Sequence, residues 1–147
     1  MTMERRSEGA ERPTPVIHPE TAFFWSSLAS GELVVQRCTS CGTKRFPFAP
    51  VCFASGSLDS DWCPVPTEGT VKAAVRVHRA TGERVWGEHV PFLAGLVDVE
   101  EGIRFTARIS CTCGQGARPG ARVTAIALVD GDGVAVLGFV HSCQGTS

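Results

Sequence analysis

Cys38-Thr39-Ser40-Cys41-Gly42 is the stretch that decides the fold of the N-terminal part of this chain. Two cysteines two residues apart, on a turn relaxed by a following glycine, can direct both thiolates at one tetrahedral ion, as in a zinc knuckle. A zinc ribbon needs a second knuckle roughly ten to twenty residues later, and Val51-Cys52-Phe53-Ala54-Ser55-Gly56 begins one at Cys52. The fourth ligand position is Ser55, whose neutral hydroxyl is a poor zinc ligand. The sequence therefore predicts a ribbon-shaped segment with an altered metal site.

Three arrangements of this site are open at the level of sequence. Cys63 takes the place of the missing ligand, or zinc is held by Cys38, Cys41, Cys52 and a water molecule, or packing alone maintains the ribbon without metal. Three protein ligands with an open fourth position also describe a catalytic zinc. No His-Glu pair stands close in sequence to act as a base and its orienting partner, so a catalytic zinc is not predicted.

A short helix is predicted before the ribbon, starting at His18-Pro19-Glu20. Proline suits a first helical turn, and glutamate favours the positive end of the helix dipole. Phe24, Trp25 and Leu28 form an apolar stripe at spacings of three and four residues, and Gly31 ends the helix. Residues 1–17 are charged and lack an apolar signal-peptide core, so they are predicted to be a disordered tail.

After Pro64 the pattern becomes that of β-strands, which are expected at residues 71–77, 92–99, 103–109, 121–130 and 134–141. In the first strand, alternation predicts that Val71, Ala73, Val75 and Val77 face the core. Glu101-Gly102 and Asp130-Gly131-Asp132-Gly133 supply hairpin turns. Five strands with these connections fit a small closed barrel of the OB type. The expected fold class is mainly β, with an N-terminal helix and ribbon over residues 18–64, a five-stranded OB-fold barrel over 65–142, and a tail at 143–147.

The bulk composition restricts the function. The 147 residues carry a formal net charge of −1, which gives no electrostatic reason to expect nucleic acid or an anionic membrane as a partner. No apolar run approaches the roughly 20 residues needed to cross a bilayer. Without a secretion signal, seven cysteines indicate metal binding or buried thiols in a reducing compartment rather than disulfides. A cytoplasmic location is expected.

Catalytic residues are hard to assemble from this sequence, because the histidines are scattered and neither a nucleophile elbow nor a phosphate-binding loop is present. His78-Arg79 ends a predicted strand, and Trp86 lies in a glycine-flanked loop, so these residues are candidates for contacts with a ligand or partner. A solvated strand end and a ring packed over the barrel are the alternatives. Cys111, Cys113 and Cys143 are expected to be small hydrophobic residues or exposed thiols rather than a second metal site.

The order of these elements resembles a known family. The resemblance is carried by segments spread over residues 20–142: Phe23-Phe24-Trp25, Gly31-Glu32-Leu33, Gln36-Arg37-Cys38, Cys41-Gly42, Phe46-Pro47, Pro50-Val51-Cys52, Gly56-Ser57-Leu58, Gly69-Thr70-Val71, Val77-His78-Arg79, Pro91-Phe92, Leu96-Val97-Asp98 and Gly120-Ala121-Arg122-Val123. Together they resemble the zinc-ribbon/OB-fold acyl-CoA-associated family, also called domain of unknown function thirty-five.

The resemblance implies a rubredoxin-like ribbon and an OB barrel that binds the coenzyme A part of thioesters rather than oligonucleotides. It also implies a hetero-oligomer with a thiolase-fold enzyme, such as a thiolase, an acyltransferase or a lipid-transfer-protein-like aldolase, which carries the catalytic residues. Two departures stand out. Ser55 replaces the family's fourth cysteine, and Ala49-Pro50 stands where an arginine commonly precedes the third cysteine by two residues.

The chain is therefore expected to be a non-catalytic, acyl-CoA-binding subunit in acyl-CoA, lipid or steroid, aromatic-acid or polyketide metabolism, with zinc and a CoA thioester as its ligands. Arginines near strand ends and loops could contact a CoA phosphate: Arg76, Arg79, Arg84, Arg104 and Arg108. Two alternatives are a partner subunit of an enoyl-CoA hydratase and a single-stranded nucleic-acid-binding module. The near-neutral charge and the small number of aromatic residues on the barrel strands oppose the latter.

Overall fold

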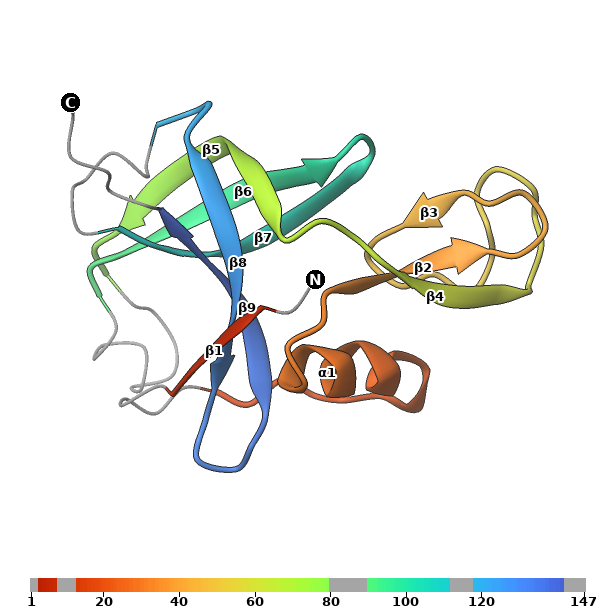
Figure 1. Ribbon diagram of the computed structural model, residues 1–147, viewed down its shortest axis with the longest axis horizontal. Helices are drawn as coiled ribbons and strands as arrows, with labels where there is room; N and C mark the ends of the chain where they lie inside the picture. Colours follow the sequence, from red (N-terminus) through yellow and green to blue (C-terminus); the bar gives the residue numbers. More distant parts are fainter. Residues whose placement is uncertain (1–2, 8–12, 80–89, 112–117, 142–147) are drawn as a thin grey trace.

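The computed structural model of the chain describes residues 3–7, 13–79, 90–111 and 118–141. A small three-stranded sheet and a larger barrel lie at opposite ends of the molecule, and one helix runs along the side that joins them (Figure 1). The predicted helix is confirmed: a 3-10 turn, η1 (Pro19–Thr21), leads into α1 (Ala22–Ala29). Its Phe24 and Leu28 side chains are buried, and Gly31 follows with a φ of 90°.

The ribbon is an antiparallel sheet with the strand order β3-β2-β4. The central strand β2 (Val34–Cys38) lies between β3 (Lys44–Arg45) and β4 (Ser60–Pro64). Along β2, Cys38 is opposite Ser60 and Val35 is opposite Cys63. The first knuckle therefore follows the end of the central strand, and residues 46–59 form the loop between the two outer strands.

The barrel consists of β5 (Glu68–Val77), β6 (Phe92–Glu100), β7 (Ile103–Ser110), β8 (Arg122–Val129) and β9 (Ala135–His141). Its strands follow the order β5-β6-β7-β9-β8 and close because β8 also pairs with β5. The β7–β9 pairing is parallel and the others in this ring are antiparallel, as in an OB barrel. The predicted fold class, mainly β with an N-terminal helix, a ribbon and a five-stranded OB barrel, is confirmed.

Both predicted hairpin turns are present. Gly102 has a φ of 81° between β6 and β7, and Gly133 has a φ of 80° between β8 and β9. The side chain of Asp130 stabilises the second turn, because its Oδ1 accepts hydrogen bonds from the backbone N–H groups of Asp132 at 2.9 Å and Val134 at 3.0 Å. Aspartate favours turns through this kind of local hydrogen bond.

The prediction of a disordered tail over residues 1–17 is wrong at its start, because Glu4–Ser7 form strand β1. This strand pairs in parallel with β8, from Glu4 opposite Ile126 to Ser7 opposite Val129. The physical reason lies in β8, whose pairing with β5 covers only residues 122–124. The rest of that strand edge has unpaired backbone groups, which β1 satisfies.

The alternation predicted for the first barrel strand is also wrong beyond Val71. A register shift between Val71 and Ala73 inserts Lys72 as an extra residue opposite β6. Such a bulge reverses which side chains face the core on the far side of it. Val71 is buried, whereas Val75 is 63% exposed on the outer surface of the barrel.

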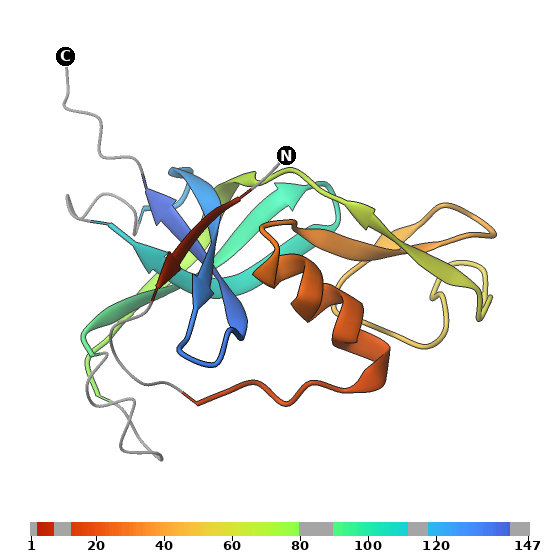
Figure 2. The same cartoon turned by 60° about the horizontal axis from the view of Figure 1, so that its bottom comes forward.

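The ribbon, the helix and the barrel share one hydrophobic core. The Phe46 ring, which follows β3, lies 4.4 Å from the Phe105 ring of β7 and 5.6 Å from the Phe24 ring of α1, centroid to centroid. Figure 2 shows α1 running between the two sheets, where it contacts β2, β8 and β9. Within the described ranges, no helix combines the length and apolar character that crossing a membrane requires.

Candidate metal centre and ligand surfaces

The two knuckles have the same backbone geometry. The Gly42 N–H donates to the Cys38 carbonyl at 2.8 Å, and the Gly56 N–H donates to the Cys52 carbonyl at 2.8 Å. Their φ values are 76° and 74°, which lie in the left-handed region that glycine adopts without strain. The second turn therefore forms a full knuckle even though Ser55 stands at its fourth position.

Three thiol groups meet between these turns. The Sγ atoms of Cys38, Cys41 and Cys52 all lie within 4.8 Å of one another, and the Cys41 and Cys52 Sγ atoms are 3.7 Å apart. The Ser55 Oγ lies 3.4 Å from the Cys38 Sγ. Zn–S bonds of about 2.3 Å and Zn–O bonds of about 2.0 Å give tetrahedral edges of about 3.8 Å between sulfurs and about 3.5 Å between sulfur and oxygen. The donor set therefore fits a Zn²⁺ ion.

The electrostatics of the site favour thiolates. Cys38 and Cys52 are buried, whereas Cys41 is exposed. The Ser55 hydroxyl, together with the backbone N–H of Cys41, lowers the pKa of Cys38 to about 6. The hydroxyl and the backbone N–H of Ser55 likewise lower the pKa of Cys52. Because the thiolate is the form that binds metal, the turns prepare their cysteines for an ion.

Substitution by Cys63 is one of the three arrangements that the sequence leaves open, and the structure places Cys63 away from the three thiols. It lies on β4, is 5% exposed and belongs to the hydrophobic core. In the ribbon register, Ser60 is opposite Cys38, and Cys63 is three residues further along the same strand. At about 3.3 Å per residue, this places it about 10 Å from the knuckle, so Cys63 packs in the core and does not join the three thiols.

Polar side chains hold the ribbon strands and its long loop together. The Gln36 amide donates to the Ser60 hydroxyl at 3.0 Å and accepts the Ala49 N–H at 3.1 Å, which connects β2 to the loop. Arg37 makes two hydrogen bonds with the Asp61 carboxylate, at 3.0 and 2.8 Å, and these lower the pKa of Asp61. The loop that carries Cys52 and Ser55 is therefore tied to the sheet that carries Cys38.

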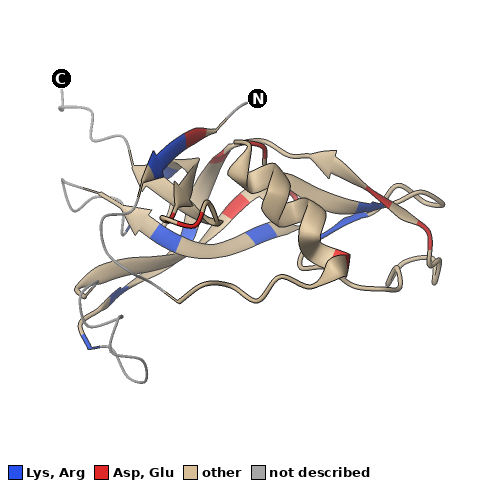
Figure 3. Cartoon of the chain, turned by 90° about the horizontal axis from the view of Figure 1, so that it is seen from below, with Lys and Arg blue, Asp and Glu red and all other residues tan. Residues whose placement is uncertain are grey.

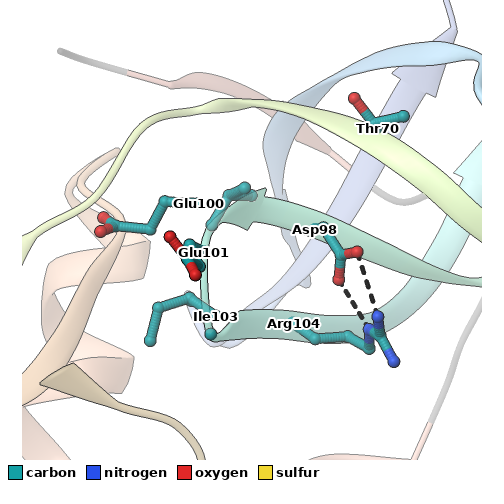
Figure 4. Close-up of a pocket in the computed structure, with 8 residues that line it drawn as sticks. Thr70, Asp98, Glu100, Glu101, Ile103 and Arg104 are labelled. Carbon is teal, nitrogen blue, oxygen red and sulfur yellow. Dashed lines mark hydrogen bonds and ion pairs between the residues drawn. The ribbon is translucent and has the colours of Figure 1, made fainter.

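The β6–β7 turn lies between two clefts. One, of about 560 Å³, is lined by Asp98, Glu100, Glu101 and Arg104, and Figure 4 shows the paired hydrogen bonds from Arg104 to Asp98. They lower the pKa of Asp98. The other, of about 450 Å³, lies between this turn and the ribbon, where the Lys44 Nζ is 3.2 Å from a Glu100 carboxylate oxygen. Carboxylates on both clefts make them poor sites for an anionic ligand.

A third, smaller cleft of about 170 Å³ has the opposite charge. It is lined by Arg76 and Arg108 together with Phe92 and Cys111, and the Arg108 guanidinium lies over the Phe92 ring at 5.5 Å from its centroid. Two guanidinium groups beside an aromatic ring can bind a phosphate and stack on a planar group. Sequence reasoning named both arginines, but only the register of β5, β6 and β7 brings them to one cleft.

The other candidate residues are dispersed. His78 and Arg79 are exposed just beyond the end of β5, and Trp86 lies outside the described residues. One pair was missed by sequence reasoning: the Cys111 Sγ lies 3.5 Å from the His141 Nδ1. The parallel pairing of β7 with β9 brings these two strand ends together, and no local pattern in the sequence signals a contact of this kind.

Residues 46–58 of the loop between β3 and β4 contain no charged residue, and the exposed Asp59 follows them directly before β4. Charged residues, coloured in Figure 3, lie on other parts of the chain. Three apolar side chains of this loop face solvent, with exposed fractions of 45% for Val51, 78% for Phe53 and 73% for Leu58. An exposed apolar group of this kind is typical of a protein interaction site.

Two family models match the chain. Residues 25–61 match the rubredoxin-like zinc ribbon domain of ChsH2, and residues 62–127 match the C-terminal OB-fold domain of ChsH2. A solved structure described as the Ltp2–ChsH2(DUF35) aldolase is similar, with a TM-score of 0.75 and 25% identity over 87% of this chain and 98% of that chain. A DUF35-family protein of unknown function from Sulfolobus solfataricus shares the fold, with a TM-score of 0.57 and 12% identity over 84% of this chain and 86% of that chain.

Two curated proteins are also similar to the chain. It is 31% identical over 100 residues to a probable enoyl-CoA hydratase alpha subunit of Thermomonospora curvata, and 36% identical over 90 residues to the 3-oxo-4,17-pregnadiene-20-carboxyl-CoA hydratase alpha subunit of Mycobacterium tuberculosis. These matches cover 68% and 61% of this chain but 30% and 28% of the relatives. The chain therefore spans less than a third of the length of these relatives.

Proposed function

Because this chain belongs to the ChsH2/DUF35 family of zinc-ribbon and OB-fold proteins, we propose that it is a non-catalytic subunit of an acyl-CoA-processing complex. In this proposal it associates with a thiolase-fold enzyme, such as a thiolase, an acyltransferase or an aldolase. The partner supplies the catalytic residues, and the small subunit helps to hold the acyl-CoA substrate.

The similarity to the Ltp2–ChsH2(DUF35) aldolase carries this proposal, because it extends over 98% of that chain. A subunit of the same fold and size in an enzyme complex supports the same kind of role here. The hydratase relatives favour a second candidate, a complex with an enoyl-CoA hydratase. A CoA thioester is the substrate class that the name of the Mycobacterium tuberculosis relative contains, which supports an acyl-CoA ligand in either case.

The uncharged loop of residues 46–58 is the surface we assign to the thiolase-fold partner. Phe53 and Leu58 are the most exposed large apolar side chains of this loop. Aromatic residues at the centre of an interface, where charged groups are depleted, contribute most of its binding energy. The loop also lies between β3 and β4 and is hydrogen-bonded to Gln36, so it can bind with little loss of conformational entropy.

The cleft between Arg76 and Arg108 is the place we assign to the phosphates of coenzyme A. Guanidinium groups bind phosphate through paired, charge-assisted hydrogen bonds, and the Phe92 ring, with Arg108 over it, lines the same cleft. His78 and Arg79 follow at the end of the same strand as Arg76, where they extend the basic surface. We assign Trp86 to the same ligand contact on the basis of its sequence position.

We also propose that Cys38, Cys41 and Cys52 hold a structural Zn²⁺ ion. Zinc bound there would cross-link the two knuckles, which a hydrogen bond between the Ser40 and Ser57 hydroxyls also connects. Small segments with little core of their own gain much of their folding free energy from such an ion. The ion in this proposal stabilises the ribbon and takes no part in a reaction.

Co-expression with a thiolase-fold enzyme, followed by affinity capture and size-exclusion chromatography, tests the proposed function. We expect the two proteins to elute together, and we expect the complex to bind acyl-CoA more tightly than the enzyme subunit alone. Co-elution with an enoyl-CoA hydratase instead would support the second candidate. A chain that remains a monomer in the presence of both enzymes would contradict both proposals.

A further inference from the structure

We propose that the Ser55 hydroxyl oxygen is the fourth donor of the ribbon site, which gives a site of three thiolates and one oxygen that exchanges Zn²⁺ readily. This inference rests on the zinc binding by Cys38, Cys41 and Cys52 proposed above. It replaces two of the arrangements that the sequence left open, substitution by Cys63 and a fourth position filled by water alone.

The equivalence of the two knuckles is the first argument. Each turn has a donor at its first and fourth positions, and a glycine in the left-handed region follows the fourth. A second pair of backbone hydrogen bonds also matches between the two turns. The Cys38 N–H donates to the Thr43 carbonyl, and the Cys52 N–H donates to the Ser57 carbonyl, both at 2.9 Å. Ser55 therefore occupies the position in the second turn that Cys41 occupies in the first.

The position of the oxygen is the second argument. The Ser55 Oγ lies 3.4 Å from the Cys38 Sγ, close to the edge of about 3.5 Å expected between sulfur and oxygen in a zinc tetrahedron. The backbone N–H of Ser57 donates to the same oxygen at 3.3 Å. This bond holds the hydroxyl toward the thiols and leaves a lone pair of the oxygen for an ion.

The competing donors are accounted for. Cys63 is buried in the core beside Val35, about three residues along β4 from the level of Cys38. Among the residues that the structure describes, no fourth cysteine, histidine or carboxylate joins the three thiols. The Thr43 hydroxyl lies 3.1 Å from the Cys41 Sγ but is not at a knuckle position, whereas Ser55 is.

The donor chemistry determines how the site behaves. A neutral hydroxyl is a weaker donor to Zn²⁺ than a thiolate, and a site with three thiolates carries one negative charge fewer than a four-cysteine ribbon. Cys41 is also exposed, so a chelator or a competing thiolate can reach the ion at that corner. We therefore expect the three thiolates and the Ser55 hydroxyl together to hold the zinc ion, and we expect the ion to exchange with chelators and competing thiolates in solution.

The test uses the purified full chain and three variants, Ser55→Ala, Ser55→Cys and Ser40→Ala. Ser40 is the matched control, because its hydroxyl is in the other knuckle and bonds to the Ser57 Oγ at 3.0 Å. Zinc affinity is measured by competition with a chromophoric chelator, and zinc release is measured by mixing with excess chelator. The Co²⁺ forms are compared by their visible absorption, which reports the donor set and geometry.

We expect Ser55→Ala to weaken zinc binding by at least about 10-fold, because removing even an indirect ligand contact has an effect of this size. Ser55→Cys should tighten binding, slow zinc release and change the Co²⁺ spectrum to that of four thiolates, and Ser40→Ala should match the natural chain. The inference is overturned if Ser55→Ala retains the natural affinity and Co²⁺ spectrum. If the natural chain binds no zinc, the proposed zinc site itself fails, which is a separate result.

Discussion

Replacing Phe53 by serine tests whether the uncharged loop of residues 46–58 is the docking surface. The Phe53 side chain is 78% exposed, so about 150 Å² of an aromatic side chain of about 200 Å² remains available to a partner. At about 25 cal/mol per Å², burying it is worth about 4 kcal/mol before ordering costs of about 1 kcal/mol. Phe53→Ser should therefore weaken binding to the partner by about 2–3 kcal/mol, which corresponds to a dissociation constant about 30- to 140-fold larger.

Val75→Ser is the matched control, because Val75 is another exposed apolar residue, 63% accessible, but lies on the outer face of the barrel away from the ribbon. Substitutions at exposed sites change stability by about 0.5 kcal/mol or less, so both variants should unfold at the same urea concentration as the natural chain. Calorimetric titration into the thiolase-fold partner gives the dissociation constants. An unchanged constant for Phe53→Ser, or an equal loss for Val75→Ser, would refute the assignment of this surface.

Three further outcomes are expected. Phe105→Ala should lower the free energy of unfolding in urea by about 3–5 kcal/mol, because it removes a buried ring that packs against Phe46. A loss below about 1 kcal/mol would contradict the close packing of this ring. The hydrogen bonds from Arg37 lower the pKa of Asp61 in the folded chain, so their stabilisation is present above about pH 4 and is lost as the pH falls below that value. In Asp61→Asn, the free energy of unfolding in urea should therefore fall less steeply with pH below about 4. An unchanged dependence on pH would count against the Arg37–Asp61 ion pair. Chelator treatment should expose Cys41 to iodoacetamide while Cys63 stays unlabelled in the folded chain, as peptide mass spectrometry can show; labelling of Cys63 at the same rate would contradict its burial.

Local signals predicted most of the fold correctly. The apolar stripe of α1 depends on neighbours in sequence, and Phe24 and Leu28 in it are buried. The strands expected at residues 92–99 and 103–109 are present as β6 and β7. Glycine and aspartate placed the turns for the same reason, since the left-handed conformation and the Asp130 hydrogen bonds are local properties. The OB-type barrel was predicted from the five strands and the lengths of their connections, and the resemblance implied the same fold.

The errors arose where distant parts of the chain meet. The extra residue Lys72 reverses the faces of β5 only because of its register with β6, and β1 forms because β8 has an open edge. Cys63 has a cysteine's chemistry at a suitable distance in sequence, but the β2–β4 register places it in the core. The contact between Cys111 and His141 depends on a parallel pairing of strands that are not consecutive. Spacing alone contains none of this information.

The loop of residues 46–58 connects the metal centre to the proposed partner surface. Cys52 is one of the three clustered thiols and Ser55 is the fourth donor that we propose, and Phe53 lies between them in sequence and faces solvent. The start of the loop is fixed as well, because Phe46 packs on Phe105 in the barrel core. A loop held at one end by the core and in the middle by an ion can present Phe53 in one orientation, which lowers the entropy lost on binding. The altered fourth ligand therefore bears on docking as well as on stability, since any loosening of the second knuckle also loosens the residue that we expect to contact the enzyme.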